Sequence, residues 1–144
     1  MSRVEPRGNV EFTARERAEM FVDAGSFVEI SPLRKANESG GSGVVIGWGM
    51  TSGHPVVVAS HDAAVASGAI GAVFAQQIMR AQRLAIDKGY QIVYINDSGG
   101  ANINDGIHAI QGCGGIIYNT VLAQQTLPHI SLITGTSAHA RAYN

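Results

Sequence analysis

Three strand-like segments separated by two long helical segments constrain the fold of this chain most strongly. The apolar run Val56–Ala59 is followed by a helical pattern over 70–88, a strand-like segment over 90–96, a helical segment over 107–125 and a strand-like segment over 129–134. Strands that alternate with helices of this length form parallel sheets with right-handed crossovers. Continuous apolar character is typical of strands that are covered on both faces. The sequence therefore predicts an α/β domain with a buried sheet.

The N-terminal half adds shorter elements to this plan. A helix is expected over 13–23, because Thr13 can cap it and Glu16 stands at the capping-box position. A short strand follows over 26–30, and 31–42 reads as a loop. Two strands, over 43–50 and 55–60, flank the hairpin signal Ser52-Gly53. The first twelve residues are expected to be loosely ordered, and Gly112, Gly114 and Gly115 are expected to interrupt or delay the helix over 107–125.

Composition excludes several classes of protein. The 144 residues suffice for one domain, and the net charge of -1 argues against a large nucleic-acid footprint or an electrostatic membrane surface. No apolar run reaches spanning length, and the first residues carry no signal-like stretch. The single cysteine, Cys113, allows no internal disulfide and no cysteine-based zinc cluster, and we expect it in the core. A cytoplasmic protein is the simplest interpretation.

The strand over 90–96 ends in the turn Asp97-Ser98-Gly99-Gly100-Ala101. Adjacent glycines allow backbone N–H groups to point outward together, which suits a phosphate, a carboxylate or a developing enolate. The alternative is a tight connection in which glycine only permits the geometry, with Asp97 as a cap, a ligand or a turn residue. The patterns of dinucleotide-binding and Walker loops are absent.

A second small-residue segment, Gly135-Thr136-Ser137-Ala138-His139-Ala140, follows the last strand. Ligands of α/β sheets bind at the carboxyl edge, so two such segments on neighbouring strands predict a shared anion site. His139 is either a general acid or base or a solvent-facing residue at a helix start. A third candidate, over 63–71, has side chains small enough for a flat or extended ligand, or is a simple linker. The five histidines show no metal spacing, so no metal site is predicted.

The motif Asp97-Ser98-Gly99-Gly100-Ala101-Asn102 resembles the DSGGAR or DSGGAN motif of the carboxyltransferase (beta) subunit of biotin-dependent acyl-CoA carboxylases. The terminal Asn is most similar to the methylcrotonyl-CoA and geranyl-CoA branch, whereas the propionyl-CoA and acetyl-CoA branches usually have Arg. Further likenesses follow in the family's order across 13–143. They are Glu16-Arg17 with "ER", 23–29 with "DPGSFVE", 43–49 with "GVVTGYG", 61–68 with "DxTVxGG", 117–119 with "FYN" and 128–133 with "PQISVI".

This resemblance implies an incomplete crotonase-like (ClpP/crotonase) fold of ββα repeats, in which 1–144 form part of the N-terminal carboxyltransferase domain. It implies an acyl-CoA substrate and an enolate whose oxyanion is held by backbone N–H groups. Positions matched to the family's oxyanion loops are Gly99, Gly100, Ala101, His139 and Ala140. Positions matched to a segment near the acyl-CoA are Ala63, Ala64, Val65, Ser67, Gly68 and Asn102.

The resemblance also implies partners. Biotin, as carboxybiotin on a separate carrier protein, would deliver the carboxyl group. A complementary carboxyltransferase chain and a biotin carboxylase or carrier subunit would complete the enzyme, in a homo- or hetero-oligomer. The isolated chain is expected to be inactive.

The chain departs from the family pattern in the second loop. The family reads G-x-x-x-G-G-x-x-Y, whose glycine pair falls at His139 and Ala140, or G-x-x-x-x-G-G-A-Y, whose pair falls at Ala140 and Arg141, and neither pair is glycine here. Two alternatives therefore stay open beside the carboxyltransferase component. One is a non-catalytic remnant or assembly subunit, and the other is an unrelated CoA- or nucleotide-binding α/β module.

Overall fold

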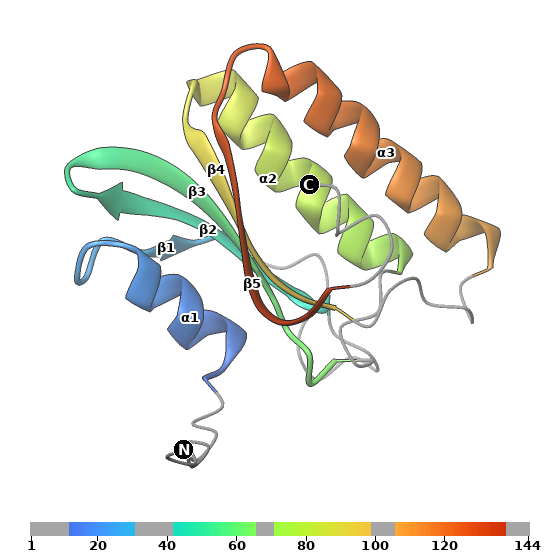
Figure 1. Cartoon of the computed structure of the whole chain (residues 1–144), viewed down its shortest axis with the longest axis horizontal. Helices are drawn as coiled ribbons and strands as arrows, with labels where there is room; N and C mark the ends of the chain where they lie inside the picture. The colour runs from blue at the N-terminus through green and yellow to red at the C-terminus, as the bar shows by residue number, and fades with distance from the viewer. Residues whose placement is uncertain (1–11, 31–41, 66–70, 99–105, 138–144) are drawn as a thin grey trace, which may run out of the picture.

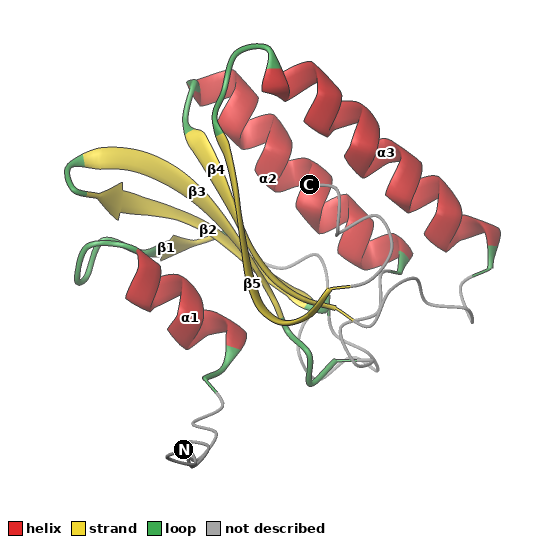
Figure 2. Cartoon of the chain, in the orientation of Figure 1, coloured by secondary structure: helices red, strands yellow, loops and turns green. Residues whose placement is uncertain are grey.

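The computed structural model describes residues 12–30, 42–65, 71–98 and 106–137, and these form one twisted sheet with helices on both faces (Figures 1 and 2). The sheet has the order β1-β2-β3-β4-β5. Its strands are β1 (Val28–Glu29), β2 (Val44–Thr51), β3 (His54–His61), β4 (Gln91–Ser98) and β5 (His129–Ser137). The first three strands pair antiparallel, and β3, β4 and β5 are parallel. The predicted α/β class is confirmed.

The helices divide between the two faces of the sheet. Helix α1 (Ala14–Phe21) covers one face, and α2 (Ala72–Lys88) packs on the other, with α3 (Ile107–Gln124) alongside α2 (Figure 1). In the described part of the chain, every helix is too short or too polar to cross a lipid bilayer. Because side chains of a strand alternate, the two faces hold two separate apolar clusters.

The core confirms the reading of β3 and β4 as strands covered on both faces. Val57, Ala59, Ile92 and Tyr94 lie in the cluster with α2. On the other face, the buried residues form a cluster with α1: Ala18, Val22, Val56, Val58, Val93 and Ile95. The two clusters together bury every residue from Val56 to Ala59.

Hydrogen bonds between residues close in the sequence or in the fold define the start of α1 and the hairpin turn between β2 and β3. Thr13 and Glu16 form the predicted capping box, since the Thr13 hydroxyl accepts from the Glu16 N–H at 3.2 Å and the Glu16 carboxylate accepts from the Thr13 N–H at 2.8 Å. The Thr13 N–H and then the Thr13 hydroxyl, which both donate to the Glu16 carboxylate, lower the pKa of Glu16. The hairpin turn at Ser52-Gly53 is confirmed, with φ of 51° and 80°, and the Asp23 carboxylate accepts from both N–H groups.

The predicted interruption of the 107–125 helix is wrong, because α3 is continuous. Its glycines serve packing instead: a Cβ at Gly112 would lie 2.5 Å from the Ala75 Cβ, and one at Gly115 would lie 2.7 Å from the Met79 sulfur. Glycine at these two positions brings α3 close to α2, and this gain outweighs the loss of helix propensity. The predicted strand over 26–30 is reduced to β1, which has only two residues.

One face of the helical layer stays apolar and exposed. Helix α3 presents Ile107, Ile110, Ile117, Tyr118, Val121 and Leu122 outward, and β5 exposes Ile130 and Ile133. Cys113 is half-buried beside the α2 cluster, close to its expected place in the core.

Candidate carboxyl-edge site

The parallel strands end side by side at one edge of the sheet. Ser98 at the end of β4 pairs with Ser137 at the end of β5. The segments starting at residues 99 and 138 therefore leave the sheet from neighbouring points, as the two-loop prediction requires. Both strands are longer than predicted: Asp97 and Ser98 belong to β4, and Gly135, Thr136 and Ser137 belong to β5 rather than to a loop.

The extra length of β5 contains an irregularity. Between the pairs Asn96–Ile133 and Ser98–Ser137, β4 supplies one residue, Asp97, whereas β5 supplies 134–136. Such bulges bend a strand and are common next to functional sites. The bulge keeps β5 hydrogen-bonded to β4 beyond the point at which a loop was predicted, and this is the physical reason for the difference.

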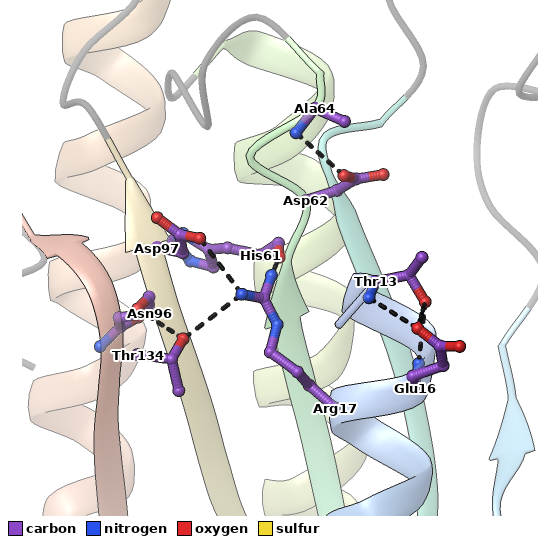
Figure 3. Close-up of polar contacts among 9 residues, drawn as sticks. All are labelled: Thr13, Glu16, Arg17, His61, Asp62, Ala64, Asn96, Asp97 and Thr134. Carbon is purple, nitrogen blue, oxygen red and sulfur yellow. Dashed lines mark hydrogen bonds and ion pairs between the residues drawn. The ribbon is translucent and has the colours of Figure 1, made fainter. Parts of the chain in front are cut away.

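Arg17 of α1 forms hydrogen bonds with residues near the ends of three strands (Figure 3). Its Nη1 lies 3.1 Å from Asp97 Oδ2 on β4 and 3.5 Å from Thr134 Oγ1 on β5, and its Nη2 donates to the His61 carbonyl on β3 at 2.5 Å. The Arg17 and Asp97 side chains are only 16% and 23% exposed. A charge-assisted hydrogen bond of this kind is stronger than a neutral one, and screening by solvent is reduced.

The Asp97 carboxylate lies against the backbone of Gly135. A Cβ added at Gly135 would collide with the carboxylate oxygens and carbon of Asp97. A residue with a Cβ at position 135 would therefore force the Asp97 carboxylate to move. Asp97 is neither a helix cap nor a turn residue, contrary to two of the three roles considered for it. It is a strand residue whose charge is balanced by Arg17.

A cavity of about 950 Å³ lies between α1 and this edge, large enough for part of a sizeable ligand. Its lining combines apolar side chains with the polar cluster. The residues are Phe12, Thr13, Ala14, Arg17, Met20, Phe21, Asp62, Ala63, Ala64, Ile95, Asp97, Leu132, Thr134 and Gly135.

The third predicted candidate contributes to this cavity in part. Ala63 and Ala64 line it, and the Ala64 N–H donates to the Asp62 carboxylate at 3.1 Å, which shapes the turn after β3. Val65 is half-buried outside the lining. The preceding His61 is buried and packs edge-on against the Phe74 ring, at 4.8 Å between centroids. His61 therefore contacts the α2 side while Asp62 faces the cavity.

Several predicted positions lie outside the described residues: Ser67, Gly68, Gly99, Gly100, Ala101, Asn102, His139 and Ala140. Their roles stay predictions. The structure brings together the strand ends that lead into them. Within the described ranges, no group of three or more His, Cys, Asp or Glu side chains could hold a metal ion.

Sequence reasoning missed Arg17 and Thr134. Arg17 falls on the inner side of a short amphipathic helix, next to the buried Ala14 and Ala18. A cation at such a position implies a carboxylate on the facing strand. The Glu16-Arg17 pair carried part of the family resemblance without a role for the arginine.

Comparison with known proteins decides the family. The Carboxyl transferase domain family matches residues 3–144. The chain belongs to this family. The propionyl-CoA carboxylase beta chain of Saccharopolyspora erythraea is 39% identical over 141 residues, which cover 92% of this chain and 26% of the relative. The chain thus spans about a quarter of the length of that carboxylase subunit.

Solved structures support the same assignment. Transcarboxylase 12S, in a hexamer structure with methylmalonyl-coenzyme A bound, superposes with a TM-score of 0.85 at 31% identity, over 91% of this chain and 27% of that chain. A Pseudomonas malonate decarboxylase hetero-dimer superposes with a TM-score of 0.72 at 26% identity, over 83% of this chain and 51% of that chain. The predicted crotonase-like carboxyltransferase fold is confirmed, in part of its length.

Proposed function

We propose that this carboxyl transferase domain chain is a component that binds an acyl-CoA and stabilises its enolate during carboxyl transfer. The observation that carries the proposal is the pairing of Ser98 with Ser137, which starts the segments 99–101 and 138–140 from adjacent strand ends. Backbone N–H groups converging on one point are the usual device for holding an oxyanion. Membership of the family supports the same reaction class.

The cavity offers a place for part of the acyl-CoA. Ala63, Ala64 and Gly135 border it with little side-chain bulk, while Ile95 and Leu132 supply apolar surface. These residues fit an extended ligand with an apolar portion. Ser67, Gly68 and Asn102 are proposed to extend the contacts, and Asn102 points by resemblance to a branched, unsaturated acyl group.

Carboxybiotin on a separate carrier would supply the carboxyl group. A complementary carboxyltransferase chain that completes the site is proposed on the family resemblance. Homo- or hetero-oligomerisation and a cytoplasmic location belong to the same proposal.

Calorimetry with propionyl-, methylcrotonyl- and geranyl-CoA tests the binding step. We expect saturable binding that Ala64→Trp abolishes, because the indole would fill the cavity beside the β3 turn. Gln76→Trp is the matched control, since Gln76 is exposed on the far side of α2. Absence of binding by the unmodified chain would refute autonomous acyl-CoA recognition. Binding that Ala64→Trp leaves intact would place the ligand elsewhere.

A non-catalytic assembly subunit is the second candidate. Two observations favour it: the second motif lacks its glycine pair at Ala140 and Arg141, and α3 presents a broad apolar face. Exposed apolar patches of this kind mark interaction surfaces. Mixing the chain with a complementary carboxyltransferase chain and a biotinylated carrier separates the two candidates, because stable assembly without carboxyl transfer is expected only of the assembly subunit. The third possibility, an unrelated α/β module, is overturned by family membership.

A further inference from the structure

We propose that Arg17 is a positioning residue that fixes the ends of β4 and β5 relative to each other. The inference rests on the proposed function, because those strand ends lead into the two motif segments. Arg17 touches none of the reacting groups in this proposal. Its role is to hold the strand ends from which they are presented.

The contacts of Arg17 span the fold. One guanidinium from α1 reaches Asp97, Thr134 and the His61 carbonyl, which lie on three adjacent strands. Arginine suits this task because its donors form a rigid planar fork that can serve several acceptors at once. Ordinary sheet hydrogen bonds join neighbours in pairs, whereas this side chain joins β3, β4 and β5 through a single group.

The bulge explains why hydrogen bonds from Arg17 are needed to hold the strand ends together. At the position of Asp97 the regular pairing of β4 with β5 is broken, and beyond it only the pair Ser98–Ser137 joins the strand ends, so the ladder holds them less firmly than a regular one would. The Asp97 carboxylate occupies the space left by the missing side chain of Gly135. A carboxylate at this half-buried place requires a partner, because burial of an uncompensated charge is costly. Arg17 provides that partner from the face of α1.

Thr134 continues the hydrogen-bond network of Arg17 into the bulge. Its hydroxyl accepts from Arg17 Nη1 and donates to the Asn96 carbonyl at 3.3 Å. The Asn96 side-chain amide donates to Ser131 Oγ at 2.6 Å, in the regular part of the ladder before the bulge. Arg17 is thus connected to both strands just before they end.

The consequence for the proposed reaction is geometric. Oxyanion stabilisation depends on donors placed before the reaction, and a misplacement of about 1 Å far from the chemistry can cost on the order of 10²-fold in rate. A shift between the ends of β4 and β5 would be transmitted to the segments that start there. Arg17 should therefore affect turnover more than affinity for the acyl-CoA.

Amide hydrogen exchange on the full chain tests the structural claim without any ligand. Arg17→Met should accelerate exchange at the strand ends, over 97–98 and 136–137, by roughly tenfold or more relative to the wild type. Exchange of the central Val93 and Ile95 amides should change far less. Arg15→Met is the matched control on the same helix, because Arg15 pairs with Glu19 and Glu29 and its side chain is 55% exposed.

A second variant separates charge from geometry and guards against misfolding. Arg17→Lys keeps the charge near Asp97 but loses the fork, so it should restore the fold and only part of the exchange protection. Uniform acceleration across β4, or equal effects of the Arg15 and Arg17 variants, would overturn the proposal. If Arg17→Met does not fold, the Arg17→Lys comparison decides by the same criterion.

Kinetics of the reconstituted carboxyltransferase provide the functional readout. Both Arg17 variants should lower kcat about 10- to 100-fold with KM for the acyl-CoA within about twofold. A rise in KM at unchanged kcat would contradict the positioning role. If the wild-type complex transfers no carboxyl group, the proposed function fails, while hydrogen exchange still decides whether Arg17 fixes the strand ends.

Discussion

The Asp97 carboxylate on β4 sits where the Cβ of any other residue at Gly135 on β5 would lie. Gly135→Ala should therefore push Asp97 away from Arg17 and open the β4–β5 bulge. Overpacking of this kind typically costs about 1–3 kcal/mol of unfolding free energy. Urea unfolding followed by circular dichroism measures the change.

Gly114→Ala is the control for that substitution. Gly114 lies within α3 with nothing near its missing Cβ, so alanine there should stabilise by about 0.5–1 kcal/mol through helix propensity. Equal responses at the two positions would contradict the contact between Gly135 and Asp97.

A buried amide joins α2, α3 and β4. Gln82 Nε2 donates to the Thr120 hydroxyl at 2.9 Å, the Tyr94 hydroxyl at 3.1 Å and the Ile116 carbonyl at 3.2 Å. Gln82→Leu removes the donor while keeping most of the volume, so it should cost about 1–3 kcal/mol of stability. Gln76→Leu on the exposed side of α2 should stay within about 0.5 kcal/mol of the wild type in the same thermal unfolding experiment.

Much of this fold follows from patterns that are local in the sequence. The capping box of Thr13 and Glu16, the Ser52-Gly53 hairpin and the apolar face of α2 all depend on residues within a few positions of one another. Each was predictable because its chemistry is complete within one segment. The parallel pairing of the later strands then followed from the helical crossovers.

The features that define the site depend on residues far apart. Arg17 and Asp97 are separated by 80 positions, and neither has a local reason for its place. The glycines of α3 were misjudged for the same reason, since contact with Ala75 outweighs their low helix propensity. The bulge in β5 also arises between strands, so a scan of either segment alone ended the strand too early.

Protonation of His129 should make the stability depend on pH. His129 starts β5 beside Tyr94, and burial lowers its pKa below the ordinary value of 6.5. The unfolded chain therefore binds a proton more readily, so this contribution to stability is complete above about pH 6.5 and is lost as the pH falls toward the folded pKa. Urea concentrations at the unfolding midpoint, measured between pH 5 and 8, should be lower at the acid end of this range.

His129→Asn should flatten that part of the profile. The matched control is His54→Asn, in the exposed hairpin, which should keep the acid-side fall of the wild type. A wild-type slope in the His129 variant would assign the pH dependence to another group.

The helix cap gives a second, separate pH response. Hydrogen bonds from Thr13 lower the pKa of Glu16, so its contribution is present above the unfolded value of 4.5 and declines as the pH falls through the folded pKa. Thr13→Ala should destabilise α1 by about 0.5–2 kcal/mol at neutral pH. It should also weaken in part the loss of stability below pH 4.5, because alanine removes the Thr13 hydroxyl but keeps the Thr13 N–H, which is the larger cause of the lowered pKa of Glu16. Unchanged acid unfolding in this variant would contradict the role of the capping box.

Restoring the family's glycine pair tests whether the second motif limits catalysis. Ala140→Gly with Arg141→Gly should raise kcat of the reconstituted complex, because glycine frees the backbone to present N–H donors and removes a bulky cation. Each oxyanion donor is typically worth about 10²–10³-fold in kcat, which sets the upper range of the gain. Ala138→Gly, in the same segment but outside the motif's glycine pair, is the control for added flexibility. An equal gain from the control would trace the effect to flexibility, and no gain from the pair would show that this departure leaves the oxyanion site intact.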